Sequence, residues 1–172
     1  MSPSVRGAVS DRRRTLRRPH RPPPPGASRE RLLGVKETSP IQRPPGPPVV
    51  LLDANMLFLV VEEHFPLQGE LDRLLPAARV RVPESVRGEI TRLAERGRSA
   101  ARAALELSGR YPIAATGLQG DDALEALARE TGAWTVTADR RLRERLESIG
   151  AGVLFPRGRH HLSRSPRSPP LP

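Results

Sequence analysis

The stretch "VVLLDANMLF", residues 49–58, decides how the rest of the chain is interpreted. Four apolar residues of strand length run directly into Asp53, and the amide of Asn55 follows two positions later. One interpretation is helix capping, because an Asp or Asn before an apolar helical run accepts hydrogen bonds from free backbone N–H groups. The other interpretation is a metal site at the end of a buried strand. The remaining sequence has to separate the two.

Positive charge is concentrated outside the part of the chain that begins with this stretch. The formal net charge is +10, but residues 1–48 hold eleven Lys or Arg against three acids, and residues 157–172 hold four Arg and no acid. Residues 49–156 therefore hold 14 basic and 16 acidic side chains, a net charge of −2. The high isoelectric point does not by itself indicate a basic nucleic-acid-binding domain.

Proline follows the same division, with eleven of its twenty residues before position 49 and four after position 156. We predict a disordered Arg/Pro-rich leader over 1–48, one folded domain over 49–157, and a disordered basic Pro/Ser-rich tail over 158–172. The leader's Arg pairs precede no apolar segment, and no run approaches the ~18 apolar residues of a membrane span, so we expect a cytoplasmic protein. With no cysteine, the chain has neither disulfides nor Cys-ligated zinc.

Strand and helix signals alternate through the domain. Short apolar runs predict strands over 49–53, 79–82, 112–115, 133–138 and 151–155, and amphipathic segments between them predict helices. This alternation predicts an α/β fold with three layers, a parallel sheet flanked by helices. Ligand sites in such folds lie beyond the carboxyl ends of the strands. If Asp53 is functional, further acids should lie at other strand ends or on helices that face the same crevice.

Acids occur at those places. Asp139 follows the strand "WTVTA" as Asp53 follows "VVLL", although an N-cap for the helix that begins at Arg140 is an equal alternative. Asp121 and Asp122 open the next-to-last predicted helix. Asp121 lies on the apolar stripe of that helix, whereas Asp122 is rotated by about 100° toward solvent and suits a capping or supporting role.

Glu89 lies within the apolar stripe formed by Val86, Ile90 and Leu93. We expect its carboxylate to lose solvation, which is costly unless the group is paired or binds a metal. The alternative is a half-exposed glutamate at the edge of the stripe, paired with Arg92. Several carboxylates in one crevice repel each other, and they persist where hard cations such as Mg²⁺ or Mn²⁺ share their oxygens.

Three segments, "LLDANML", "VPESVRGEITRLAERG" and "GDDALEALARETGAWTVTADRRLRERL", resemble PIN-domain ribonucleases, most closely the archaeal relatives of the eukaryotic PIN endonuclease that processes small-subunit ribosomal RNA. The resemblance covers nearly all of 49–156. It implies a five-stranded parallel sheet and a metal-dependent endoribonuclease that cleaves single-stranded RNA with one or two Mg²⁺ or Mn²⁺ ions. By its motifs, the resemblance implies that the catalytic and metal-binding residues are Asp53, Glu89, Asp121 and Asp139. It also implies that Asn55 and Thr137 are supporting polar residues. The position of Asp122 on its helix suggests a supporting role for that residue too.

RNA, and pre-ribosomal RNA in particular, is the partner that this resemblance implies, and homodimer formation is a further expectation. Phosphate contacts dominate RNA affinity, and Arg140 and Arg141 directly follow Asp139, so we expect them to guide a phosphate. We expect Arg143 and Arg145 to form a solvated face paired with Glu144 and Glu147. Trp134, at a strand start, is a packing residue rather than a base-stacking one.

Three other functions are alternatives to this hypothesis. A VapC-type toxin ribonuclease that acts on tRNA shares the same core features. A catalytically inactive RNA-binding scaffold would have no reason to keep all four acids. A phosphotransfer protein with Asp53 as acceptor needs a lysine late in the domain, and the sole lysine of the chain is Lys36.

Overall fold

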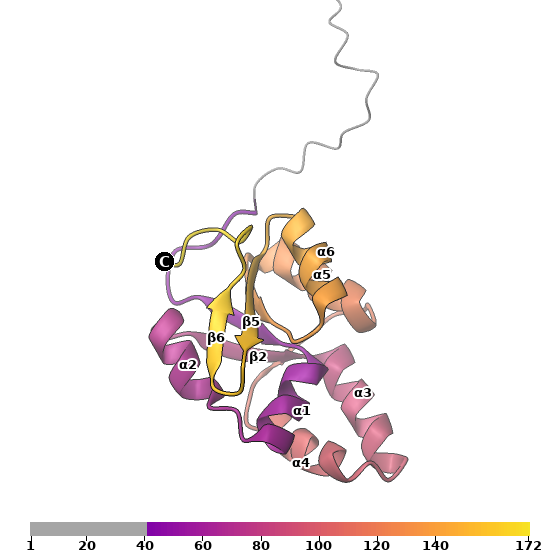
Figure 1. The fold of residues 1–172 in the computed structure, drawn as a ribbon. Coiled ribbons are helices and arrows are strands. Elements are labelled where there is room, and N and C mark those ends of the chain that lie inside the picture. The colour runs from indigo at the N-terminus through magenta and orange to yellow at the C-terminus, as the bar shows by residue number, and fades with distance from the viewer. Residues whose placement is uncertain (1–40) are drawn as a thin grey trace, which may run out of the picture. The chain divides into compact units, whose positions relative to one another are not determined.

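The computed structural model describes residues 41–172, so most of the predicted leader, residues 1–40, lies outside the described residues. The elements follow each other in the order β1 (Val49–Leu52), α1 (Ala54–Glu63), α2 (Leu67–Leu74), β2 (Arg79–Pro83), α3 (Glu84–Glu95), α4 (Ser99–Ser108), β3 (Ile113–Ala114), α5 (Gly120–Thr131), β4 (Trp134–Val136), α6 (Arg140–Ser148), β5 (Gly152–Arg157) and β6 (His161–Arg164). Figure 1 shows this arrangement. Among these helices, none is both long and apolar enough to cross a membrane.

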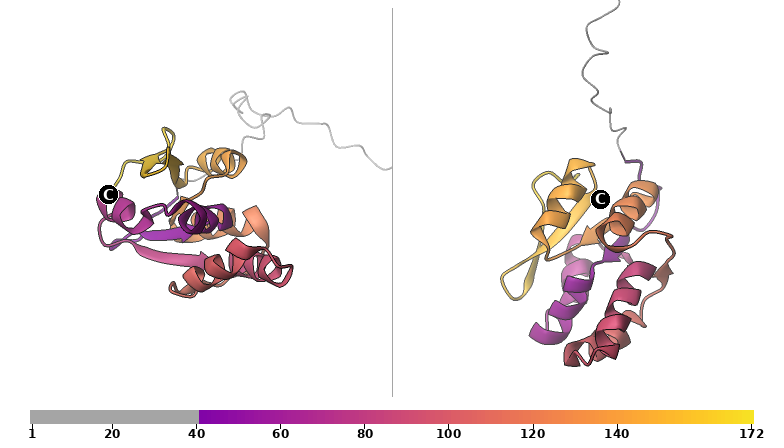
Figure 2. Two further views of the ribbon diagram at one scale, coloured as in Figure 1. Left: turned by 60° about the horizontal axis from the view of Figure 1, so that its bottom comes forward. Right: turned by 90° about the vertical axis from the view of Figure 1, so that its right-hand side faces the viewer.

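The strands form one mostly parallel sheet in the order β3-β2-β1-β4-β5-β6, flanked by helices (Figure 2). Strand β1 lies near the middle and pairs in parallel with β2 on one side and β4 on the other. The predicted α/β architecture is confirmed, and the five predicted strands are present and parallel. The carboxyl ends of β1 and β4 are neighbours, which brings the residues after each strand together.

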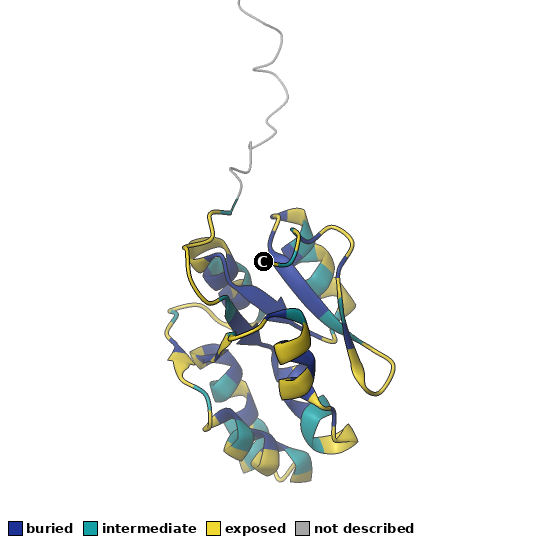
Figure 3. Cartoon of the chain, turned by 90° about the vertical axis from the view of Figure 1, so that its left-hand side faces the viewer, coloured by how far each residue is buried: buried dark blue, intermediate teal, exposed yellow. Residues whose placement is uncertain are grey.

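Strand β1 reads as a continuous apolar run because helices or loops cover both of its faces. Val50, Leu51 and Leu52 are each at most 1% exposed, and the buried residues continue through the neighbouring strands (Figure 3). Burying such side chains is the main favourable contribution to folding, about 1.5–3 kcal/mol for each large one. Burial of β1 in the core therefore fixes the position of Asp53, the residue that directly follows the strand.

The end of the chain differs from the prediction. Residues 158–172 were expected to be a disordered tail, but β6 pairs antiparallel with β5 and adds a sixth strand. Leu162 is 2% exposed, Ser165 and Ser168 are buried, and the Ser165 N–H donates to the Val153 carbonyl at 2.9 Å. Composition misled here, because an open sheet edge offers backbone partners to a segment with few apolar residues.

A buried glutamate ties β6 to helix α2. Glu70 is 8% exposed, and it accepts hydrogen bonds from Arg73 Nη2 at 2.6 Å and from the Leu162 N–H at 2.7 Å. Arg73 also donates to the Leu162 carbonyl at 2.8 Å. The hydrogen bonds from Arg73 are the largest cause that holds the pKa of Glu70 at about 2, well below its ordinary 4.5. The charged form of Glu70 therefore stabilises the fold.

We predict that Glu70→Gln lowers the free energy of unfolding at pH 7 by about 1–3 kcal/mol, the cost of weakening charge-assisted hydrogen bonds to a buried group. Because the folded pKa is depressed, the wild-type stabilisation is complete above pH 4.5 and is lost as the pH falls toward 2. Urea denaturation between pH 7 and pH 3 measures this. The control, Glu95→Gln, changes an exposed acid of α3. Parallel pH curves for wild type and Glu70→Gln would contradict the assignment.

Trp134 is 1% exposed, so it is a core residue, as predicted. Its indole lies against Gly152 of the neighbouring strand, where an added Cβ would be 2.5 Å from a ring carbon. Real Cβ atoms do not approach other heavy atoms so closely. The pair therefore needs glycine at position 152.

Gly152→Ala should destabilise the domain by about 1–3 kcal/mol, because the indole must shift inside a packed core. The matched control is Gly88→Ala in the interior of α3, where nothing lies within 4 Å of an added Cβ. That control should stabilise the helix by about 0.5–1 kcal/mol. Thermal unfolding of both variants measures the two opposite shifts, and equal melting temperatures would refute the packing argument.

Candidate functional site

Asp53 is held where the carboxyl ends of β1 and β4 meet. It directly follows β1, and its backbone N–H donates to the Val136 carbonyl of β4 at 3.2 Å. Thr137, which follows β4, donates its hydroxyl to Asp53 Oδ2 at 2.8 Å. Both side chains are buried, with Asp53 7% and Thr137 0% exposed. The adjacency of two parallel strands thus fixes a carboxylate in a site with little water.

Burial raises the pKa of Asp53 to about 6 from its ordinary 3.8. Hydrogen bonds from Thr137 and from the Ala54 backbone act in the opposite direction, and the carboxylates of Asp121 and Glu89 raise the pKa further. Two of the predicted acids, Glu89 of α3 and Asp121 of α5, therefore act electrostatically on a third, Asp53 at the end of β1. At neutral pH the Asp53 carboxylate is charged at a cost that a cation beside it would offset.

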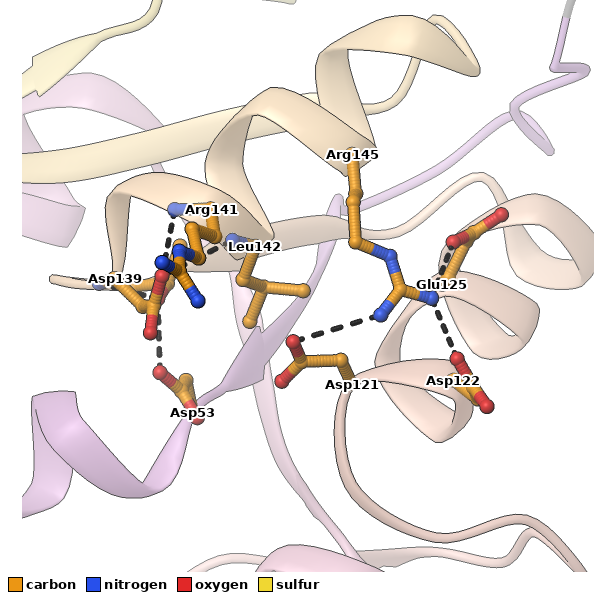
Figure 4. A network of polar contacts seen from close by, with 9 residues as sticks. Asp53, Asp121, Asp122, Glu125, Asp139, Arg141, Leu142 and Arg145 are labelled. Atoms are coloured by element: carbon orange, nitrogen blue, oxygen red, sulfur yellow. Dashed lines mark hydrogen bonds and ion pairs between the residues drawn. The ribbon is translucent and has the colours of Figure 1, made fainter.

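Asp139 caps helix α6, as the capping alternative anticipated. Its Oδ1 accepts from the backbone N–H groups of Arg141 at 2.6 Å and Leu142 at 3.1 Å, and its own N–H donates to Thr137 Oγ1 at 2.9 Å. Thr137 consequently bridges Asp53 and Asp139, which lie one above the other in Figure 4. Both capping bonds go to a single carboxylate oxygen, so capping and metal binding by Asp139 are compatible.

Arg145 links α6 to the acidic start of α5. It pairs with Asp121 at 3.5 Å, with Asp122 at 2.5 Å and with Glu125 at 2.9 Å, and Asp121 lies between this cluster and Asp53 (Figure 4). Asp122 is therefore an ion-pair partner of Arg145. The capping role is wrong, because residue Gln119 is the N-cap of α5 and Asp122 lies beyond it.

The expectation that Arg143 and Arg145 pair with Glu144 and Glu147 of the same helix is wrong. Arg145 reaches α5, and Arg143 lies over the Phe155 ring at 4.4 Å from the centroid. Arg140 does pair with Glu144 at 2.9 Å, and both side chains are largely exposed. No local pattern could have revealed the Arg145 cluster, because its acids lie 20–24 positions earlier in the chain.

Glu89 is exposed, so the expectation that it loses solvation is wrong. Val86 and Ile90 are buried, but Leu93 is only partly buried, so the apolar stripe is narrower than predicted and Glu89 lies at its edge. Among the described residues, neither Arg92 nor another arginine forms an ion pair with it. Glu89 nevertheless acts on Asp53 from α3.

The acids of the site are not preassembled around an ion. Within residues 41–172, no group of three His, Asp or Glu side chains is already arranged to hold an ion. The acids are engaged by Thr137, by helix N–H groups and by Arg145, whose contact with Asp121 involves one carboxylate oxygen at 3.5 Å. The donors are all carboxylate oxygens, which fit Mg²⁺ or Mn²⁺, and His64 is exposed at the C-cap of α1.

A groove of about 640 Å³ opens beside Asp139. Asn55 and Phe58 of α1 line one side, Asp139 and the following Arg140 and Arg141 line another, and Arg98 closes it from the start of α4. The predicted residues Asn55, Arg140 and Arg141 thus share one depression with Asp139. The sequence did not point to Phe58 or Arg98, because their pairing joins positions 40 residues apart without a local pattern.

The fold is similar to that of a known protein. The solved structure titled "Structure of the PIN domain endonuclease Utp24" superposes with a TM-score of 0.61 and 20% sequence identity, over 74% of this chain and 98% of that chain. No curated protein matches the sequence. Residues 50–159, which run from β1 past β5 and contain every acid of the site, match the family described as "PIN like domain". The chain therefore belongs to the PIN-like domain family.

Proposed function

We propose that this protein is a metal-dependent endoribonuclease that cleaves single-stranded RNA. The observation that carries the proposal is the buried Asp53 carboxylate, whose pKa is raised to about 6 in the company of Asp121 and Glu89. Strongly perturbed acids in a site beside a groove are a feature of functional centres. Family membership and the structural likeness to a PIN endonuclease support the same conclusion.

Asp53, Glu89, Asp121 and Asp139 would hold Mg²⁺ or Mn²⁺. A bound cation would supply an acidified water and would neutralise charge on the phosphodiester. Thr137 orients Asp53 and Asp139 through its two hydrogen bonds, and Asn55 lines the groove next to them. Asp122 supports the site by sharing the Arg145 guanidinium with Asp121.

Arg140 and Arg141 are proposed to bind RNA phosphates, since both line the groove next to Asp139. The Arg140–Glu144 pair is exposed, and such pairs contribute about 0–1 kcal/mol, so a phosphate can replace the glutamate at little cost. Processing of pre-ribosomal RNA is the role that we favour, on the resemblance of the sequence motifs.

One observation favours a second candidate, an RNA-binding scaffold without catalytic activity. Arg145 neutralises Asp121, Asp122 and Glu125 within the chain, and Asp139 caps a helix, so these acids have structural roles that require no metal. A scaffold would bind single-stranded RNA in Mn²⁺ and leave it intact. A nuclease cleaves it.

We expect Mn²⁺- or Mg²⁺-dependent cleavage of single-stranded RNA that EDTA abolishes and that Asp139→Asn reduces by about 100-fold or more, because the lost carboxylate weakens charge stabilisation worth several kcal/mol. Asparagine caps helices about as well as aspartate, so this variant should keep its fold. Glu130→Gln, an exposed acid at the far end of α5, is the control. Pre-ribosomal RNA and tRNA are assayed side by side, and a cut confined to tRNA would favour a toxin-type role. Activity that survives EDTA or Asp139→Asn rules out the metal mechanism.

Asp53→Asn should stabilise the metal-free protein by about 1–3 kcal/mol at pH 8, because it removes a charge that burial disfavours. The sign follows from the raised pKa. The penalty is present above the folded pKa of about 6, shrinks as the pH falls, and vanishes below the ordinary 3.8, where the carboxyl is protonated in both states. Urea unfolding in EDTA at several pH values measures it. A variant less stable than wild type at pH 8 would show that the carboxylate serves the fold and not the site.

A further inference from the structure

We propose that Arg98, seated on the Phe58 ring, is a stacking platform for one unpaired base of the RNA next to the phosphate that is cleaved. The inference rests on the proposed function in taking single-stranded RNA as the ligand. It assigns a binding role to Arg98 and Phe58, which line the same groove as Arg140 and Arg141.

The guanidinium of Arg98 is held in a fixed place. Its central carbon lies 3.8 Å from the Phe58 ring centroid, and its Nη2 lies 3.4 Å from the Glu62 carboxylate. Phe58 is 5% exposed, whereas the Arg98 side chain is 47% exposed. One face of the guanidinium plane therefore covers the ring, and the rest of the group remains accessible to a ligand in the groove.

The position suits a nucleotide. The groove is about 640 Å³, within the range of about 300–1,000 Å³ of sites that bury small ligands. Asp139 lies in the same groove and is joined through Thr137 to Asp53. A base that lies on Arg98 would thus keep its neighbouring phosphate within the groove that Asp139, Arg140 and Arg141 line.

Fully exposed aromatic rings are absent from residues 41–172. Unpaired bases stack on aromatic rings and on arginine guanidinium planes. All five aromatic residues lie within the described part of the chain, and each is buried or partly buried: Phe58, Phe65, Tyr111, Trp134 and Phe155. An arginine supported by a ring offers the planar surface that these residues do not expose.

The test measures binding of a fluorescent single-stranded oligoribonucleotide by anisotropy, in Ca²⁺ in place of Mn²⁺ to separate binding from cleavage. Arg98→Lys keeps the charge but not the plane, so it should weaken binding by about tenfold, as should Arg98→Ala. The matched control is Arg96→Lys, an exposed arginine two positions earlier that does not line the groove. It should bind as wild type does. Circular dichroism and thermal unfolding verify that each variant is folded.

Oligonucleotides with a single abasic site, placed at each position in turn, identify the stacked base. In wild type one abasic position should weaken binding by about tenfold, and in Arg98→Lys the same position should have no further effect. The inference is overturned if Arg98→Lys binds RNA with wild-type affinity, or if the abasic site still weakens binding in that variant. Arg98 would then serve only to connect α1 and α4. Failure of the wild type to bind single-stranded RNA overturns it as well.

Cleavage in Mn²⁺ is recorded separately, so the two proposals fail independently. Binding that depends on Arg98 and the base, without cleavage, supports the stacking subsite and rejects the nuclease function. Cleavage by wild type together with full binding by Arg98→Lys supports the nuclease and rejects the subsite.

Discussion

The hydrogen bond from Thr137 to Asp53 joins the two central strands at the point on which the site depends. The apolar strand β1 is buried between β2 and β4. Asp53, which follows β1, therefore lies beside Thr137, which follows β4. The carboxylate loses water there, and its pKa rises to about 6. The Thr137 hydroxyl also accepts from the Asp139 N–H, so one buried threonine sets the positions of two acids and the start of helix α6.

Charge balance around that hydrogen bond determines which states of the site are accessible. Asp121 raises the pKa of Asp53 and at the same time contacts Arg145, which also neutralises Asp122 and Glu125. The Arg145 cluster therefore offsets the repulsion among the acids at the start of α5.

Polar residues also complete the fold where apolar ones are scarce. Strand β6 buries one large apolar side chain, Leu162, and it is held by backbone pairing with β5 and by Glu70 and Arg73 of α2. Composition predicted disorder for this segment, since the few apolar groups could not offset the ordering entropy. The open edge of an existing sheet changes that balance, and sequence composition does not report it.

The sequence by itself determined the alternation of strands and helices, the parallel sheet and the positions of Asp53, Asp121 and Asp139, because periodicity and strand-end placement are local properties. Helical periodicity and the family motif both pointed to Glu89, but periodicity wrongly predicted that its side chain loses solvation. Only the tertiary structure showed that Arg145 pairs with the acids of α5, that Arg98 lies over the Phe58 ring, and that a sixth strand completes the sheet. Each of these joins residues far apart in the chain, and their contact depends on how the helices pack, which no local pattern encodes.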